Sequence, residues 1–145
     1  MNRRDALLQI LAGMREDMQD YSRLRELLDA QFLAAIQHDS VEIASVGERI
    51  VELTARMESR RQRRVELATI IVGEPGARVS IERVAEQLRG AARTTFEASW
   101  NQLEAQLQQC KSLNQRNCRL LMDQHDIMQR VLHSENDTYA PSTAA

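Results

Sequence analysis

Aromatic residues, glycine and proline are all scarce in this sequence. Its 145 residues include one Trp, two Tyr, two Phe, five Gly and two Pro. Residues that favour strands are few, whereas Ala, Leu, Gln, Glu and Arg are abundant, a composition typical of long helices. A glycine-rich phosphate loop and the HExxH and GxSxG motifs are also absent. The sequence therefore favours an all-α protein that is not an enzyme.

Long apolar runs and a dominant charge are missing as well. The longest uninterrupted apolar runs are only a few residues, far short of the about 20 residues that a membrane-spanning helix needs. The start, from Met1 to Asp5, leads into an amphipathic segment, so we expect no signal peptide. A net charge of -2 gives no overall positive field that would attract nucleic acid or anionic lipid. We expect a soluble cytoplasmic protein with no membrane insertion and no nucleic-acid partner.

Cysteine and histidine form no pattern that indicates a disulfide or a metal site. Cys110 and Cys118 are eight positions apart, which is about 12 Å along a helix and too far for a disulfide within it. This spacing matches no zinc motif, and the three His residues add no nearby ligands. We therefore expect reduced thiols, no metal and no cofactor.

Two long helices are predicted in the first half of the chain, where apolar residues recur at steps of three and four. Asn2 is suited to cap a helix over about residues 4–37, and Asp39 to cap a second over about residues 40–72. The sequence Gly73-Glu74-Pro75-Gly76 must end the second helix. Because the connection between the two helices is short, we expect them to fold back on each other.

The second half predicts a short linker helix, a third long helix and a tail. Ser80 is expected to cap the linker helix over residues 81–89, and the long helix covers about residues 91–133. Residues 134–145 are polar and small, which predicts a flexible C-terminal tail. The predicted fold is one helical domain over residues 1–133, an elongated antiparallel three-helix bundle that resembles a coiled coil.

Arginines concentrate between Arg56 and Arg64, in the middle of the second predicted helix. Arg60 and Arg64 fall on the apolar stripe of that helix. Such a run can contact phosphates, but no aromatic side chains for base stacking adjoin it. Arginine stems can also cover a bundle while their charged groups pair with nearby Glu residues. We interpret the run as a solvated face, and nucleic-acid binding through Arg60–Arg64 as the weaker alternative.

The apolar stripe of the third long helix turns polar towards its end. Continuing the spacing from Phe96 places Asn114, Asn117 and Gln124 where apolar side chains are expected. Amides at such positions cost stability but fix the register of packed helices. Alternatively, this stretch is only partly covered, and its amides and leucines contact a partner helix. The sequence leaves both interpretations open, and both can hold together.

The polar stretch contains a motif, because residues 113–124 read LNQRNCRLLMDQ. This resembles the LNxxNxxLLxxQ core of the FlgN-type flagellar export chaperones, which are small acidic helical proteins. Trp100 followed by Leu103 upstream, and Tyr139 shortly after the predicted helix end, also match the family pattern. The first two helices agree with the family only in length, heptad character and polarity.

The resemblance implies a cytoplasmic chaperone with no ATPase activity of its own. Such a chaperone binds the C-terminal helical ends of hook-filament junction proteins, which are FlgK-like and FlgL-like. It prevents their premature assembly and delivers them to the flagellar type III export apparatus, where Tyr139 is expected to dock on an export-gate component. A helix-binding face that extends to Met128 would serve this function, and the partner-binding residues implied within it are Leu113, Asn114, Asn117, Leu120, Leu121 and Gln124.

A different class of function is also compatible with the helical pattern. The same apolar stripes would serve a structural or adaptor coiled-coil protein that acts through homo-oligomerisation. A stable oligomer that covers residues 113–124 would favour this alternative.

Overall fold

The computed structural model describes residues 1–73 and 81–139, with side chains up to residue 133. Its helices are α1 (Arg3–Ile36), α2 (Ser40–Val72), α3 (Ile81–Glu86) and α4 (Gly90–Tyr139). The part of the chain that the structure describes contains no strand. The predicted all-α fold is therefore confirmed.

Polar side chains begin both helices of the first half, as predicted. The Asn2 side chain accepts a hydrogen bond from the backbone N–H of Asp5 at 2.8 Å. The Asp39 side chain accepts one from the backbone N–H of Glu42 at 3.1 Å. Each bond satisfies an N–H that has no partner within its own helix. The third predicted cap, Ser80, lies outside the described residues.

The C-terminal ends of the helices follow the sequence less closely. α2 ends as predicted, because Gly73 adopts the left-handed conformation (φ 77°) and its N–H donates to the Thr69 carbonyl at 2.8 Å. The prediction for the last helix was too short, since α4 continues from residue 133 to Tyr139. Residues 134–139 include no Pro or Gly that would break the helical hydrogen-bond pattern. The remainder of the predicted tail, residues 140–145, lies outside the described residues.

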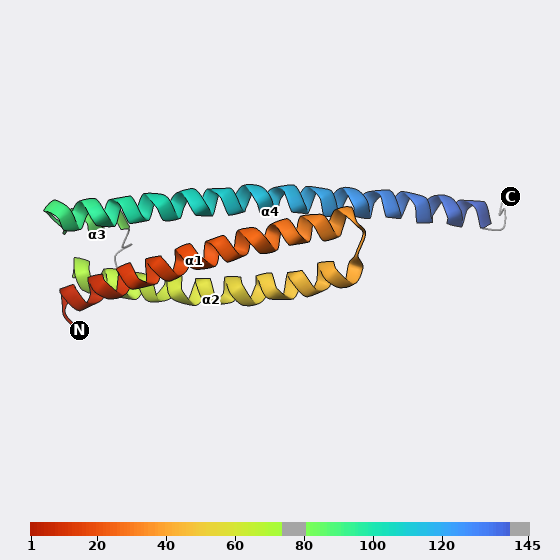
Figure 1. Ribbon diagram of the computed structural model, residues 1–145. Helices are drawn as coiled ribbons and strands as arrows, with labels where there is room; N and C mark the ends of the chain where they lie inside the picture. The colour runs from red at the N-terminus through yellow and green to blue at the C-terminus, as the bar shows by residue number, and fades with distance from the viewer. Residues whose placement is uncertain (74–80, 140–145) are drawn as a thin grey trace.

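The three long helices form an elongated bundle with α1 in its centre (Figure 1). α2 runs antiparallel to α1 and α4 runs parallel to it, so α2 is antiparallel to both (Figure 1). No described Cα atom of α2 comes within 8 Å of one in α4, whereas each of these helices packs directly on α1. The short helix α3 contacts both α2 and α4 at one end of the bundle. The bundle is therefore closed around α1 and open between α2 and α4.

The core consists of two clusters along α1. The cluster near the N-terminus includes Ile10, Met14, Leu67, Val84 and Phe96, and the second cluster is formed by Leu24, Leu27, Leu28, Val46, Leu53 and Cys110. α1 carries two buried stripes, although the sequence predicted one, because it is packed between α2 and α4. The additional stripe contains Ala6, Ile10, Asp17, Leu24 and Leu27.

Candidate protein-interaction surface

Asn117, at the centre of the motif, lies buried against α1 and not on the surface. Its side-chain N–H groups donate to the Leu28 carbonyl at 2.7 Å and to the Gln31 side chain at 2.9 Å. Its side-chain oxygen accepts a hydrogen bond from the Arg116 guanidinium at 3.1 Å. Asn117 is 1% exposed, so in this structure it cannot contact a partner.

Asn117 belongs to a ladder of polar side chains that joins α4 to the backbone of α1. Cys110, Asn117 and Gln124 are each seven residues apart in α4. They donate respectively to the carbonyls of Tyr21 (3.6 Å), Leu28 (2.7 Å) and Ala35 (2.7 Å), which are also seven residues apart in α1. A carbonyl oxygen has two lone pairs, so it can accept this bond beside its own helical one. The geometry favours the interpretation that these polar residues fix the register of α4 on α1.

The other predicted partner-binding residues differ in exposure. Asn114 is exposed, and its described polar contact is a weak one with the Cys118 thiol at 3.9 Å. Leu113, Leu120 and Leu121 are half-buried. The structure thus divides the motif into residues that hold α4 in place and residues that remain at least partly accessible.

We expect Asn117→Ala to lower the free energy of unfolding by about 1–3 kcal/mol, since it removes the buried bond to the Leu28 carbonyl and the bonds with the partly buried Gln31 and Arg116 side chains. Asn114→Ala is the matched control, because it removes the same group three residues earlier from an exposed position. Its effect should stay within about 0.5 kcal/mol. Urea unfolding followed by circular dichroism measures both, and equal effects would contradict the structural role of Asn117.

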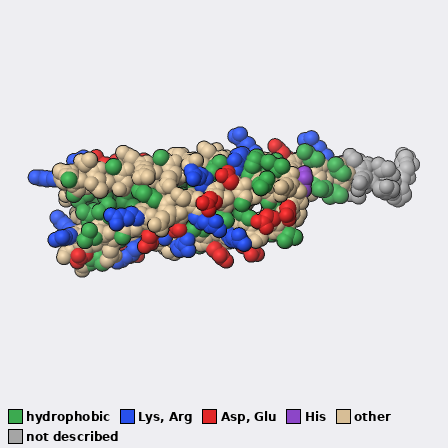
Figure 2. Space-filling model, viewed as in Figure 1, with side chains coloured by type: hydrophobic (Ala, Val, Ile, Leu, Met, Phe, Trp, Pro, Cys, Tyr) green, Lys and Arg blue, Asp and Glu red, His purple; other side chains and the backbone are tan. Residues whose placement is uncertain are grey.

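The end of α4 extends past the hairpin formed by α1 and α2 (Figure 1). The apolar stripe that packs on α1 up to Gln124 continues there without cover. Ile127, Met128, Val131 and Leu132 lie on this continuation and are 46–59% exposed. Figure 2 shows hydrophobic side chains on this part of the molecule. Tyr139 ends the helix backbone, and its side chain lies outside the described part.

The tip of the hairpin also exposes apolar side chains. Leu33 and Ile36 near the end of α1, and Val41 at the start of α2, are 51–81% exposed. The hairpin tip and the projecting end of α4 therefore both present apolar surface, and contiguous exposed apolar patches are a feature of protein-interaction sites.

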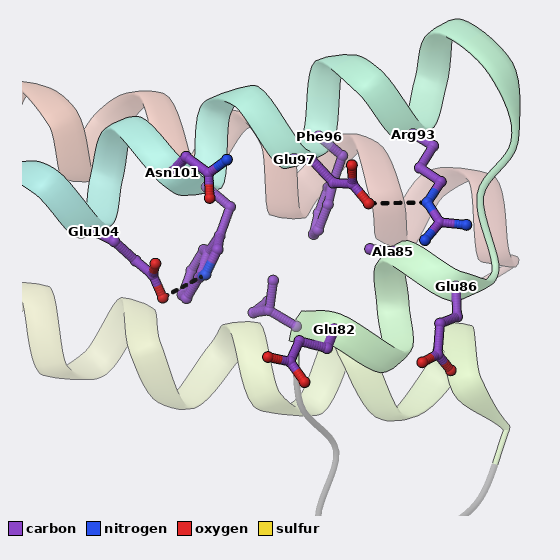
Figure 3. Close-up of a pocket in the computed structure, with 10 residues that line it drawn as sticks. Glu82, Ala85, Glu86, Arg93, Phe96, Glu97, Asn101 and Glu104 are labelled. Atoms are coloured by element: carbon purple, nitrogen blue, oxygen red, sulfur yellow. Dashed lines mark hydrogen bonds and ion pairs between the residues drawn. The ribbon is translucent and has the colours of Figure 1, made fainter.

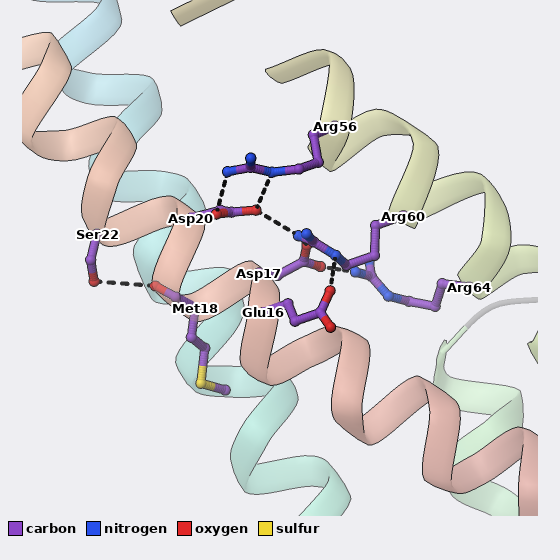
Figure 4. A network of polar contacts seen from close by, with 8 residues as sticks. All are labelled: Glu16, Asp17, Met18, Asp20, Ser22, Arg56, Arg60 and Arg64. Atoms are coloured by element: carbon purple, nitrogen blue, oxygen red, sulfur yellow. Dashed lines mark hydrogen bonds and ion pairs between the residues drawn. The ribbon is translucent and has the colours of Figure 1, made fainter. Parts of the chain in front are cut away.

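The arginine run is a solvated face only in part. The side chains of Arg56, Arg61 and Arg63 are 49–62% exposed, so the prediction from the sequence is corrected at Arg60 and Arg64 alone. Arg60 and Arg64 reach from α2 to the buried carboxylate of Asp17 in α1, and their side chains are only 14% and 12% exposed. Arg60 also pairs with Glu16 at 3.1 Å and with Asp20 at 2.9 Å (Figure 4). Charges at these positions are paired within the protein, so they offer little to a phosphate backbone.

Burial and pairing change the acidity of several groups around this network. Burial acts to raise the pKa of Asp20, but hydrogen bonds from Arg56 and Arg60 outweigh it and hold the pKa below its usual value. Burial lowers the pKa of Arg64, whose guanidinium lies 5.7 Å from the centre of the Trp100 ring. The Cys110 thiol has a raised pKa because it is buried, so it is poorly suited to act as a nucleophile.

Sequence reasoning missed Asp17, the most buried carboxylate of the network. Its position on the second stripe of α1, seven residues after Ile10 and seven before Leu24, is the signal that could have found it. The sequence does not reveal that stripe readily, because the more apolar stripe through Met14 and Tyr21 is sufficient to predict an amphipathic helix.

The described part of the chain offers neither a membrane-spanning helix nor a cluster of metal ligands. No helix there is both long and apolar enough to cross a membrane. No three His, Cys, Asp or Glu side chains among the described residues are placed to share a metal ion.

Comparison with known proteins gave one family match. A family model described as FlgN protein matches residues 1–140. Neither a curated protein nor a solved structure matches the chain. The FlgN family is a chaperone family and not an enzyme family. Because the match covers nearly the whole chain, from α1 through α4, this protein belongs to the FlgN family of flagellar export chaperones.

Proposed function

We propose that this protein is a cytoplasmic chaperone for hook-filament junction proteins of the FlgK-like and FlgL-like type. It binds their C-terminal helical ends, prevents premature assembly and delivers them to the flagellar type III export apparatus. Membership of the FlgN family supports the general role of an export chaperone.

The observation that carries this proposal is the uncovered apolar stripe at the end of α4. Up to Gln124 this stripe packs on α1, and beyond it Ile127, Met128, Val131 and Leu132 have no covering helix among the described residues. An amphipathic helix from a junction protein would pack on this stripe beyond the end of α1. Leu120 and Leu121, which are half-buried, would form the inner edge of this surface.

Binding of an unfolded cargo end to the exposed end of α4 also suits a complex that must later dissociate. A cargo end that becomes helical only on binding loses conformational entropy, which lowers its affinity for a given contact area. Docking of Tyr139 on an export-gate component is a further part of the proposal. It rests on the sequence motif alone, since the Tyr139 side chain lies outside the described residues.

Calorimetric titration of the full chain with synthetic C-terminal peptides of FlgK-like and FlgL-like proteins tests the proposal. Met128→Asp places a charge on the exposed stripe and should weaken binding by about tenfold or more. Gln129→Asp is the matched control, since it adds the same charge one residue later at an exposed position about 100° around α4, off the apolar stripe. It should leave affinity nearly unchanged.

Three results would distinguish the proposal from its alternatives. A gain of helical circular dichroism on mixing supports coupled folding of the cargo end. Failure of every such peptide to bind well-folded wild-type protein would refute the chaperone proposal. A concentration-dependent oligomer that Met128→Asp dissociates would instead indicate that a second copy covers the stripe.

A further inference from the structure

A groove runs along the open side of the bundle, between α2 and α4. We call it the α2–α4 groove. Tyr21 and Leu24 of α1 form its floor, and Thr54 of α2 and Leu107 of α4 face each other across it. It comprises two adjoining cavities of about 370 and 270 Å³ that share these residues. The larger is extended by Met57, Trp100 and Leu103, so the lining is mainly apolar.

Helix α3 already occupies the end of the space between α2 and α4 (Figure 3). Its Val84 and Ala85 side chains are 0% and 7% exposed and belong to the same core cluster as Phe96. A helix of six residues is too short to be stable alone. Its position therefore shows that this space accepts and stabilises an amphipathic helical segment.

Trp100 links the position of α3 to the empty part of the groove. It borders a cavity of about 410 Å³ beside Ile81 and Ala85 of α3, and it also lines the α2–α4 groove. From Trp100 to Asn114 the groove follows α4 for about 21 Å, or roughly four helical turns. A second helical segment could thus lie in the groove beyond the end of α3.

We infer that the α2–α4 groove binds an amphipathic helix of the cargo protein, placed end to end with α3. This inference rests on the proposed chaperone function and assigns it a second contact surface, distinct from the end of α4. The bound helix would complete a four-helix bundle along the middle of the molecule. Its apolar residues, spaced by three and four, would contact Leu24, Met57 and Leu107.

Charged residues on the rim of the groove indicate where the bound helix should carry a negative charge. Glu58 and Arg61 of α2 pair with each other at 2.6 Å. Lys111 of α4 borders the groove, is exposed and has no ion pair in the described part of the chain. A carboxylate on the cargo helix would therefore match Lys111.

Thr54→Arg tests the groove in the full-length protein. Thr54 is exposed, borders both cavities and bonds only to its own helix backbone, at the Ile50 and Val51 carbonyls. The substitution should therefore fill the groove without disturbing the core. Val51→Arg is the matched control, since Val51 is 67% exposed on the same helix and borders neither cavity.

The probes are the same C-terminal peptides of FlgK-like and FlgL-like proteins. Thr54→Arg should weaken their binding by about tenfold or more, and Val51→Arg should leave it unchanged. Trp100 is the only tryptophan, so its fluorescence should shift when the peptide binds wild-type protein and should not shift with Thr54→Arg. Far-ultraviolet circular dichroism checks that both variants remain folded.

The results with the two variants distinguish binding in the α2–α4 groove from the chaperone function on which this inference rests. Peptide binding that Met128→Asp weakens and Thr54→Arg does not would overturn the groove while leaving the chaperone function intact. Absence of binding to wild-type protein would overturn both. Self-association in sedimentation that Thr54→Arg abolishes, with peptide affinity unchanged, would assign the groove to a second copy of the chain and overturn a cargo site.

Discussion

Asp17→Ala should lower the free energy of unfolding by about 3–5 kcal/mol, as expected when one partner of a buried ion pair is removed. The Asp17 side chain is 5% exposed and pairs with both Arg60 and Arg64 across the α1–α2 interface. Arg60 retains Glu16 and Asp20 in the variant. Arg64, only 12% exposed, loses its carboxylate and keeps the Trp100 ring. Urea unfolding at neutral pH measures the loss.

Two further variants show whether the buried charge causes this loss. Glu26→Ala removes a carboxylate from the exposed pair with Arg23, whose side chains are 54% and 66% exposed, and should cost less than about 1 kcal/mol. Adding Arg64→Met to Asp17→Ala removes the unpaired cation, so it should recover part of the stability. If Asp17→Ala were as mild as Glu26→Ala, the network would be a surface feature and our description of it would be incorrect.

Phe96→Ala should also cost about 3–5 kcal/mol, because it leaves a cavity where the N-terminal core cluster meets α3. Phe96 is 0% exposed and packs in one cluster with Val84 and Ala85 of α3. The loss should reduce the melting temperature by roughly 10–15 °C. Since α3 is short and depends on this cluster, its residues should also lose protection from hydrogen exchange first.

Phe32→Ala is the matched control for Phe96. Phe32 lies on α1, is half-buried, and its ring is covered by the Arg116 guanidinium at 3.9 Å from the ring centre. Its removal leaves a smaller void that water can enter, so we expect a cost of about 1–2 kcal/mol. A larger loss from Phe32→Ala than from Phe96→Ala would contradict the placement of Phe96 at the centre of the N-terminal core cluster.

The features that the sequence predicted correctly depend on neighbouring residues. The caps at Asn2 and Asp39 act within three positions of themselves, and the end of α2 depends on the left-handed conformation that Gly73 adopts readily. Helix type follows in the same way from the spacing of apolar residues. Such signals need no knowledge of which helix packs on which.

The features that the sequence did not predict depend on the packing order of the helices. The pairing of Asp17 with Arg60 and Arg64 requires the antiparallel register of α1 and α2, which no local pattern specifies. Whether Met128 is covered depends on where α1 ends in space relative to α4. For the same reason, the open side of the bundle could not be predicted, because it arises from α1 being central.

The ladder between α4 and α1 has a consequence for how the two helices find their alignment. Its donors at Cys110, Asn117 and Gln124 and its acceptors at Tyr21, Leu28 and Ala35 repeat with the same period of seven residues. Sliding α4 by one period would therefore restore two of the three bonds and sliding it by two periods one of them, while a shift that is not a multiple of seven would break them all. The ladder alone defines the alignment only to a multiple of seven, and the fully buried aromatic side chain of Phe96 selects among those multiples.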